Sequence, residues 1–431
     1  MKNADVIIIG AGAAGLMTAF HLSKAGKQVL MLEARNRTGG RIHTIYDEPF
    51  SSHVELGAEF VHGDLPVTLQ LLMEAGINVI PATGEMWHFR NGRFSKDNQQ
   101  MDHWDLLMEK LNELENDTTI SNFLQQEFND DKYEQLREWV IKFASGYDTA
   151  DVRRASAFAL RKEWENEDDG AQHRVAGGYS MMISYLENEC KKNGGQLHLN
   201  SAVKYVYWEN GQVEVLTTSG SSFKAKKLVI ALPLGVLQAN QSQEGAISIS
   251  PSVPTYQDAI GQIGFGAIVK ILLKFKTAFW RDEAITGIDL NEMSFIISDE
   301  EIPTWWTQYP VQSNLLTGWF GGPAAENKKE LGGEDLLEQA LRSLAHIFNR
   351  SVEDLEGELT AWKIVNWTTD QFTLGSYAYD RIGSSKARKI LNTPINHTIY
   401  FAGEYLYEGP AMGTVEAALS SGLETARKII G

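Results

Sequence analysis

The most restrictive feature of the sequence is a glycine-rich turn between two apolar segments near the N-terminus. A short β-branched run at 6–9 leads into Gly-Ala-Gly-Ala-Ala-Gly at 10–15, helical spacing follows over 16–25, and a second apolar run at 29–32 ends at Glu33. This order predicts a strand, a tight turn, a helix and a second strand. It is the arrangement that binds a dinucleotide, since a pyrophosphate can approach the glycine turn and the helix N-terminus.

Each conspicuous residue of this segment has a physical task in such a site. Gly10 permits the tight turn, Gly12 lets the backbone approach the pyrophosphate, and Gly15 allows the helix to pack closely on the strand. Glu33 follows Gly15 by 18 residues and is predicted to hold the hydroxyl pair of a ribose. The fingerprint alone does not separate a nicotinamide from a flavin.

The rest of the chain divides into segments that differ in polarity and in hydrophobic period. Residues 77–170 are polar, with a helical period around 101–114 and 133–143, and we predict a helical insertion there. Short β-type runs return at 197–199, 203–208, 213–217 and 228–232, with a turn at Asn210-Gly211. Further on, we expect strands at 268–275 and 399–402 and helices at 336–349 and 415–430.

Composition limits the class of protein. The 431 residues suggest two or three packed domains, and the balance of 39 Lys plus Arg against 56 Asp plus Glu gives a net charge of −17. This charge disfavours nucleic-acid binding and favours a cationic substrate. The single cysteine, Cys190, excludes intrachain disulfides, cysteine-type zinc sites and iron–sulfur clusters. We therefore expect no metal and a cytoplasmic protein.

The N-terminus also admits a secretory interpretation, because Lys2 precedes an uncharged stretch. Asp5 offsets that charge, and the glycine turn explains the stretch better. No other segment approaches the roughly 20 apolar residues that span a bilayer, so we expect no membrane anchor.

A second group of motifs points to a flavin. Arg35, the run Gly39-Gly40-Arg41 and Thr44 resemble the second signature of flavin-binding oxidoreductases, although a loop with a solvated arginine would show the same residues. Further motifs then follow in order: 55–63 (Glu-Leu-Gly-Ala-Glu-Phe-Val-His-Gly), 232–237 (Leu-Pro-Leu-Gly-Val-Leu), 264–275, 367–377, and 401–404 leading into Thr414-Val415. In these motifs the chain resembles the flavin-containing amine oxidase family of monoamine oxidases, polyamine oxidases and lysine-specific histone demethylases. The resemblance runs from the first strand to the last helix and is closest in detail to the polyamine oxidases.

The resemblance implies an α/β fold in which a Rossmann-like FAD-binding domain is interleaved with a mixed α+β substrate-binding domain. The first would comprise 1–80, 172–258 and 370–431, and the second 81–171 and 259–369. It implies non-covalent FAD, because Ser376 stands where the monoamine oxidases carry a flavin-bound cysteine. The residues implied in cofactor contacts are Gly10, Gly12, Ala14, Gly15, Glu33, Ala34, Arg35, Gly40, Arg41, Gly57, Ala58, Glu59, Val203, Trp367, Gly403, Glu404, Thr414 and Val415.

The same resemblance implies catalytic roles. Lys270 matches a lysine that is linked through a water to flavin N5 and assists reoxidation, although its strand alone would suggest an edge-strand charge. Trp367 and Tyr377 match aromatic residues that confine the amine, although such rings are as often core residues. Thr414 replaces the second tyrosine of the monoamine oxidase cage, and His62 resembles a histidine of the animal polyamine oxidases at the active-site wall.

The function implied is oxidation of an amine C–N bond by hydride transfer to flavin N5, with O2 reoxidising the flavin to give H2O2 and an imine. His62, Thr414 and the acidic charge favour polyamines as substrates, and the acidic residues of 163–169 either recruit their distal amines or form a solvated face. Monoamines and L-amino acids are alternatives; the latter need an arginine aimed at a carboxylate, and nothing in the sequence aims Arg90 or Arg93 at the site. Histone demethylation is disfavoured, because the sequence has no long coiled-coil insertion. A non-enzymatic FAD-binding sensor or structural flavoprotein is a further alternative, and the oligomeric state is open.

Overall fold

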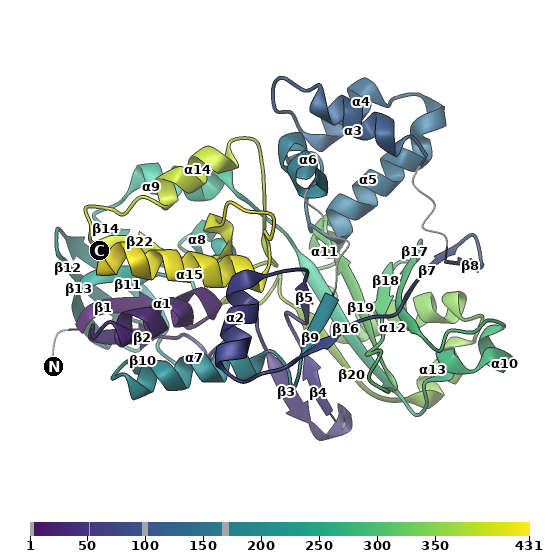
Figure 1. Ribbon diagram of the computed structural model, residues 1–431, viewed down its shortest axis with the longest axis horizontal. Helices are drawn as coiled ribbons and strands as arrows, with labels where there is room; N and C mark the ends of the chain where they lie inside the picture. The colour runs from purple at the N-terminus through teal and green to yellow at the C-terminus, as the bar shows by residue number, and fades with distance from the viewer. Residues whose placement is uncertain (1–3, 51, 97–101, 166–171) are drawn as a thin grey trace.

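The computed structural model describes residues 4–50, 52–96, 102–165 and 172–431. Two large sheets lie at opposite ends of the molecule, with a group of helices beside the second (Figure 1). Each sheet has its own apolar core.

The first sheet contains the predicted glycine turn at the end of its strand β1. β1 lies between β2 and β13, and β10, β2, β1, β13 and β22 run parallel to one another. The strands are β1 (Ala4–Ile9), β2 (Val29–Leu32), β10 (Gln196–His198), β11 (Val203–Glu209), β12 (Gln212–Thr217), β13 (Ser222–Ile230), β14 (Ser248–Ser250) and β22 (Ile399–Phe401). All four residues of β2 are buried, as expected of a parallel sheet that is covered on both faces.

Helices cover both faces of this sheet. Val6 and Ile8 of β1 share a core with the helices α1 (Ala13–Lys24), α2 (Pro66–Glu74), α7 (Ser180–Lys192) and α15 (Val415–Ile430). Ile7 and Ile9 pack on the other face with α8 (Leu234–Gln238), α9 (Pro254–Gln262) and α14 (Ser384–Leu391). This alternation follows from the period of two in a strand.

The second sheet has the order β20-β16-β19-β18-β17-β7-β8. Its strands are β7 (Glu85–Arg90), β8 (Arg93–Ser95), β16 (Ile268–Phe275), β17 (Met293–Ser298), β18 (Thr304–Trp306), β19 (Leu315–Gly321) and β20 (Leu359–Asn366). The helix α12 (Gly333–Ile347) packs on it, and α10 (Glu283–Thr286), α11 (Gly322–Asn327) and α13 (Val352–Glu358) lie in the same part of the chain.

The segment predicted to be a helical insertion is only partly helical. It begins with β6 (Val79–Pro81), β7 and β8, and β7 joins the second sheet by pairing in parallel with β17. The helices follow as α3 (Trp104–Asn112), α4 (Ile120–Glu127), α5 (Glu134–Gly146) and α6 (Ala157–Glu165), with a separate apolar core. β7 was missed because its partner β17 lies some 200 residues further along the chain, and β6 because it pairs with β9, which is also distant in sequence.

Three small sheets connect these parts. β5 (Phe60–His62) and β6 flank β9 (Gln172–Val175), β3 (Thr44–Asp47) pairs with β4 (Ser52–Glu55), and β15 (Gly264–Phe265) pairs with β21 (Ala378–Tyr379). Short 3₁₀ helices lie at Glu48–Phe50, Asp131–Tyr133, Phe279–Arg281 and Glu404–Leu406. The strands of the first sheet fall within the three segments predicted for the FAD-binding domain and those of the second within the two predicted for the substrate domain; the boundaries themselves stay a prediction.

Candidate active site

The glycine turn has the geometry that a dinucleotide needs. Gly10 has a φ of +98°, and a Cβ there would overlap the carbonyl oxygen of Ala231. A Cβ on Gly15 would overlap the carbonyl oxygen of Gly10, so that glycine allows α1 to pack on the turn. Gly12 is different, since the nearest atoms to its Cβ position, in Gly39 and Gly40, are 4.0 Å away. Packing therefore does not require glycine at position 12, but close approach of a diphosphate would.

Glu33 lies at the carboxyl end of β2, beside the turn. Its Oε2 accepts the N–H of Ala11 at 2.7 Å, and its Oε1 accepts the N–H of Arg35 at 2.9 Å. A carboxylate has about four lone-pair sites, so both oxygens keep capacity for a ribose hydroxyl. Ala14, also predicted to contact the cofactor, lies in the first turn of α1, where Gly422 of α15 packs against its carbonyl oxygen.

A cavity next to Glu33 brings together three predicted residues from distant parts of the chain. Ala34 and Arg35, which follow β2, line it together with Val203 of β11. Its volume is about 1060 Å³ with the solvent at its mouth included. Arg35 is held in place by Asp370, which accepts from both terminal nitrogens of its guanidinium. The cavity is placed to take the nucleoside end of a dinucleotide.

The second glycine pair lies beside the first turn. Gly12 and Gly39 form a parallel bridge, and the N–H of Gly39 donates to the carbonyl oxygen of Ala11 at 2.9 Å. Arg41 then reaches across to Glu404, with Nη1 and Oε1 at 3.0 Å, and also donates to the carbonyl oxygen of Ser376. The alternative of a merely solvated arginine is therefore wrong for Arg41. Gly40 and Gly403 flank this pair in sequence.

The loop 56–59 packs against Arg41 and Trp367. A Cβ on Gly57 would overlap the carbonyl oxygen of Arg41, and Trp367 Nε1 donates to the carbonyl oxygen of Leu56 at 2.9 Å. Ala58 donates its N–H to the carbonyl oxygen of Arg41 at 3.2 Å. Predicted residues from three parts of the chain thus form one continuous set of contacts.

Lys270 lies on β16, which pairs with both β19 and β20. The edge-strand interpretation is therefore wrong, and the lysine is 1% exposed within the sheet. Its Nζ donates to the carbonyl oxygen of Gly57 at 3.1 Å and to Glu59 Oε2 at 2.8 Å. Arg174 of β9 also pairs with Glu59, at 3.2 Å.

These cations decide the ionisation of Glu59. Burial alone would raise the pKa of its carboxyl group, but Lys270 and Arg174 outweigh that effect and lower the pKa to about 2. Glu59 is therefore ionised throughout the physiological range. Arg174 was not singled out in the sequence, where it stands in an ordinary short strand; only the tertiary fold brings it to Glu59.

Tyr377 and His62 meet at Tyr147, a residue that the sequence did not indicate. The Tyr377 hydroxyl donates to the carbonyl oxygen of Tyr147, and the rings of His62 and Tyr147 lie edge to face with their centroids 6.3 Å apart. Burial lowers the pKa of His62 to about 4, so its imidazole is neutral at pH 7. Burial and the nearby Asp148 raise the pKa of Tyr377 well above its ordinary value, so the phenol is neutral too.

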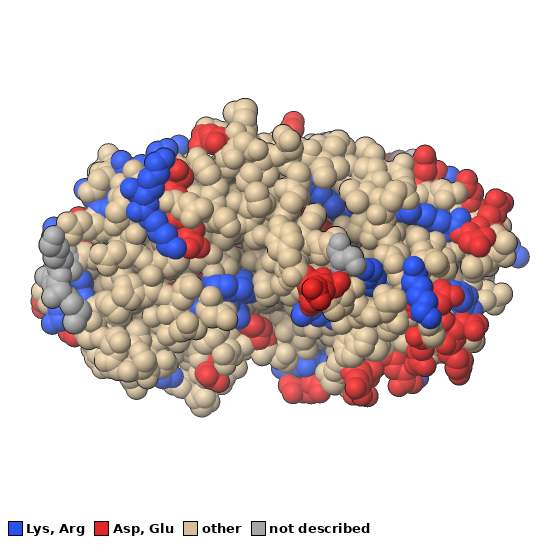
Figure 2. Space-filling model, turned by 90° about the horizontal axis from the view of Figure 1, so that it is seen from below, with Lys and Arg blue, Asp and Glu red and all other residues tan. Residues whose placement is uncertain are grey.

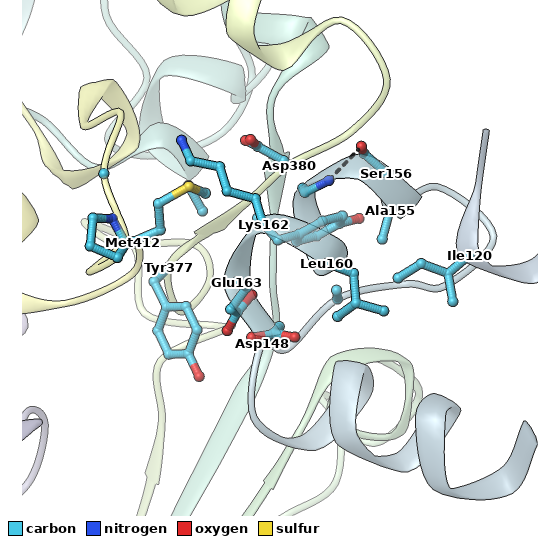
Figure 3. A pocket seen from close by; sticks show the side chains of 16 residues that line it. Ile120, Asp148, Ala155, Ser156, Leu160, Lys162, Glu163, Tyr377, Asp380 and Met412 are labelled. Carbon is cyan, nitrogen blue, oxygen red and sulfur yellow. Dashed lines mark hydrogen bonds between the residues drawn. The ribbon is translucent and has the colours of Figure 1, made fainter. Parts of the chain in front are cut away.

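A cavity of about 660 Å³, solvent at its mouth included, opens beside Tyr377. Asp148 and Glu163 lie on its wall, and Figure 3 shows their carboxyl groups pointing toward one another, with Tyr377 and Met412 also lining the cavity. Burial raises the pKa of Glu163, and a hydrogen bond with Asp148 partly offsets the effect. Of the acidic run, Glu165 is exposed, and Glu167, Asp168 and Asp169 lie outside the described residues.

Thr414 and Val415 mark the start of α15. Thr414 is the N-cap: its Oγ1 accepts the N–H of Ala417 at 3.4 Å and donates to the carbonyl oxygen of Ala411 at 2.6 Å. The Thr414 hydroxyl is thus already engaged by the helix. Val415 follows as the first helical residue, where backbone N–H groups are without intrahelical partners.

The positions of the arginines test the alternative of an L-amino-acid substrate. Arg90 and Arg93 face one another across the β7–β8 hairpin at the end of the second sheet, and both are exposed. Arg174 is buried near the site, but each of its three guanidinium nitrogens donates to a protein oxygen, in Glu59, Thr307 or Tyr309. None of these three arginines is placed to take a substrate carboxylate.

Comparison with known proteins identifies the family. The family model for flavin-containing amine oxidoreductases matches residues 13–430. The chain belongs to this family. It is therefore an enzyme that oxidises an amine with FAD as its cofactor, and the non-enzymatic alternative is set aside.

Individual relatives cover almost all of the chain. Polyamine oxidase 2 of Arabidopsis thaliana is 27% identical over 99% of this chain and 88% of that protein. Human lysine-specific histone demethylase 2 is 28% identical, but the chain spans only 53% of it. Putrescine oxidase solved with putrescine bound has a TM-score of 0.80 at 22% identity, covering 99% of each chain, and the cyclohexylamine oxidase of Brevibacterium oxydans has a TM-score of 0.79 at 18% identity. The fold predicted from the sequence is confirmed.

The residues present fit the flavin dinucleotide. The open space at Gly12, the cavity lined by Ala34, Arg35 and Val203, and the spare acceptor capacity of Glu33 lie side by side along the ends of β1 and β2. Among the described residues, no group of three or more side chains is arranged to hold a metal ion, and no helix is long and apolar enough to cross a membrane.

Proposed function

We propose that this flavoenzyme oxidises polyamines. The observation that supports this substrate class is the Asp148–Glu163 pair beside Tyr377. A polyamine that places one nitrogen at the flavin still carries further ammonium groups along its chain. Two carboxyl groups on the wall of the cavity offer such a group a counter-charge, and its approach lowers the pKa of Glu163 again.

FAD supplies the oxidising power by accepting a hydride from the carbon next to the reacting nitrogen. The protein binds and orients the amine, and it must take that nitrogen as a neutral amine, because an ammonium holds its hydride firmly. Tyr377 and His62 are both neutral near pH 7 and form an uncharged wall. The imine product then hydrolyses in water.

We also propose, as expected from the sequence, that O2 reoxidises the cofactor and yields H2O2. Trp367 and Tyr377 line the reacting nitrogen, and the position of Trp367 is fixed through Leu56. We also propose a cytoplasmic location, with which the single cysteine is compatible. The names of the relatives support the substrate class, since one is a polyamine oxidase and one solved neighbour holds putrescine.

The decisive experiment is the visible spectrum of the holoenzyme without oxygen, before and after addition of spermine. Bleaching of the oxidised flavin band supports the proposal, and it should speed up as the pH rises because more of the amine is neutral. A band that survives spermine but bleaches with benzylamine would assign a monoamine substrate instead. A reductive step without pH dependence would contradict the requirement for a neutral amine.

The acidic pair is tested by Asp148→Asn and Glu163→Gln. We expect each to raise the KM for spermine about tenfold or more, which corresponds to roughly 1.4 kcal/mol, and to change turnover of benzylamine little. Glu165→Gln is the matched control, because Glu165 lies on the same helix but is exposed. Equal losses with spermine and benzylamine would show that the pair shapes the cavity rather than binding a distal amine.

A further inference from the structure

Glu59 is the centre of a buried polar cluster that joins the loop 56–59 to the second sheet. Its Oε2 accepts from Lys270, and its Oε1 accepts from three donors: Arg174 Nε at 3.2 Å, Trp306 Nε1 at 3.0 Å and Gln308 Nε2 at 3.1 Å. The Glu59 residue is 7% exposed. These four hydrogen bonds fix both oxygens of the carboxylate. They therefore also fix the position of Lys270, which donates to one of them.

The charges of the cluster leave one unit of positive charge. Lys270 and Arg174 contribute two positive charges and Glu59 one negative charge, in a place where Lys270 is 1% and Arg174 is 8% exposed. A buried ammonium without a counter-charge tends to lose its proton. Glu59 thus supplies a direct counter-charge to Lys270 beside Arg174.

The surroundings of Lys270 hold few other ionisable groups. Its cross-strand partners, Trp319 of β19 and Val365 of β20, are uncharged. Glu55 of β4 is close enough for Lys270 to lower the pKa of its carboxyl group, although burial is the larger effect and raises that pKa to about 7. In the described part of the chain, Glu59, Arg174 and Glu55 are therefore the ionisable groups named around Lys270.

The ammonium is directed at the predicted cofactor loop. Two of its three protons have acceptors among the described residues, the carbonyl oxygen of Gly57 and Glu59 Oε2, at 3.1 and 2.8 Å. One proton is left for a third acceptor. Nζ also lies 5.4 Å from the centre of the Trp306 ring. Since Gly57 and Ala58 are the residues predicted to contact the flavin ring, the ammonium lies against the loop where the cofactor would bind.

We propose that Glu59 is a positioning residue for cofactor reoxidation, which supplies the counter-charge of Lys270 and holds its ammonium at the flavin loop. This inference rests on the proposed oxidase function. Reoxidation moves two electrons from the reduced cofactor to O2, which takes up two protons to become H2O2. The first electron makes an anion, superoxide, and a fixed positive charge stabilises it.

The kinetic test separates the two half-reactions of Glu59→Gln by stopped flow. Glutamine keeps the size of the side chain but removes its charge, so Lys270 and Arg174 face one another uncompensated. We expect reoxidation by O2 to slow tenfold or more and the slowing to grow as the pH rises from 6 to 9, while anaerobic reduction by spermine changes less than threefold. Equal slowing of both half-reactions, or slowing without pH dependence, would overturn the proposal.

Comparison variants separate charge from structure. Glu59→Asp should recover part of the reoxidation rate, because it restores the charge. Gln308→Met removes one donor to Glu59 without changing any charge, and should leave the pH dependence as in the wild type. Glu214→Gln, in a surface pair with Lys224 of the first sheet, is the control for a carboxylate-to-amide change. Because Glu55 titrates near pH 7, the profiles are repeated in a Glu55→Gln background.

A second readout uses the apoprotein. We expect Glu59→Gln and Lys270→Met each to lower the melting temperature by several degrees. The double variant should melt no lower than the worse single variant, because Lys270→Met removes the buried ammonium that Glu59→Gln leaves without its partner. Additive losses would show that the two side chains do not act as a pair. If no amine reduces the wild-type holoenzyme, the proposed function fails, and the apoprotein result still decides whether Glu59 holds Lys270.

Discussion

At the scale of single residues, Glu55 and Glu59 show how neighbours decide the ionisation of a carboxyl group. They are four residues apart and both are buried. For Glu55, burial raises the pKa to about 7, and hydrogen bonds from the N–H of Tyr179 and the hydroxyl of Thr44 offset this only in part. For Glu59, Lys270 and Arg174 outweigh burial. The difference is made by two cations that reach one carboxylate directly.

This difference predicts opposite pH dependences of stability. The folded-state pKa of Glu55 lies above the unfolded value of 4.5, so its contribution to stability is complete below pH 4.5 and is lost as the pH rises through about 7. Glu55→Gln should therefore stabilise the apoprotein at pH 8 relative to the wild type, by at most about 3.4 kcal/mol, and the difference should shrink steadily as the pH falls toward 4.5. Urea unfolding midpoints from pH 5 to 8 measure it.

Glu59, which is paired with two cations, should show the opposite pH dependence of stability. Glu59 has a depressed pKa, so its contribution is present above pH 4.5 and is lost as the pH falls toward 2. Glu59→Gln should be destabilising at every pH of the same series. A Glu55→Gln effect that is equal at pH 5 and pH 8 would show that Glu55 is not protonated by folding.

At the scale of elements, Glu416 connects the beginnings of two helices. It lies in the first turn of α15 and is 2% exposed, and its carboxylate accepts the N–H groups of Val67 and Thr68 and the hydroxyl of Thr68, at 3.0, 2.7 and 2.7 Å. α2 begins at Pro66 with no side-chain cap of its own. Glu416 thus caps α2 from another helix, and it stabilises the N-terminal ends of both helix dipoles.

Removing this cap should be costly. Glu416→Ala leaves the buried N–H of Thr68 and the half-buried N–H of Val67 without this acceptor, so we expect the free energy of unfolding to fall by about 3 kcal/mol. Thr414→Ala, which removes the cap of α15 itself, should cost about 1 kcal/mol, and Thr414→Ser should restore it. Glu424→Ala, on the surface of the same helix, is the control and should leave stability nearly unchanged. A Glu416→Ala protein as stable as this control would contradict the capping role.

At the scale of the whole molecule, the parts predicted well from the sequence are those determined by local pattern. β2, β16 and α15 have the predicted limits, because their apolar runs and the turn or cap at their ends lie within a few residues. β7 was missed, since it is stabilised by pairing with β17 far along the chain. Tyr147, Asp148 and Arg174 were missed for the same reason: each gains its place in the site only from tertiary contacts.

The net charge of −17 is also a property of the whole molecule. It follows from the sequence, but the distribution of the charged residues over the surface does not. Figure 2 shows that Asp and Glu gather densely at the end that carries the second sheet, while the middle of that face is mostly uncharged. A field of this kind attracts cationic amines toward the molecule, and salt weakens it.

Binding of FAD should stabilise the molecule as a whole, because its predicted contacts come from the ends of β1 and β2, from Val203 and from the segment 403–415. At a free FAD concentration of one hundred times Kd, the gain is about 2.7 kcal/mol. For 431 residues, at about 2.1 cal/mol/K of unfolding entropy per residue, this raises the melting temperature of the apoprotein by about 3 °C. Riboflavin lacks the diphosphate and the adenosine, and cannot use the glycine turn or the cavity beside Glu33, so it should raise the melting temperature much less. If riboflavin and FAD stabilised the apoprotein equally, the glycine turn and that cavity would not be the dinucleotide site.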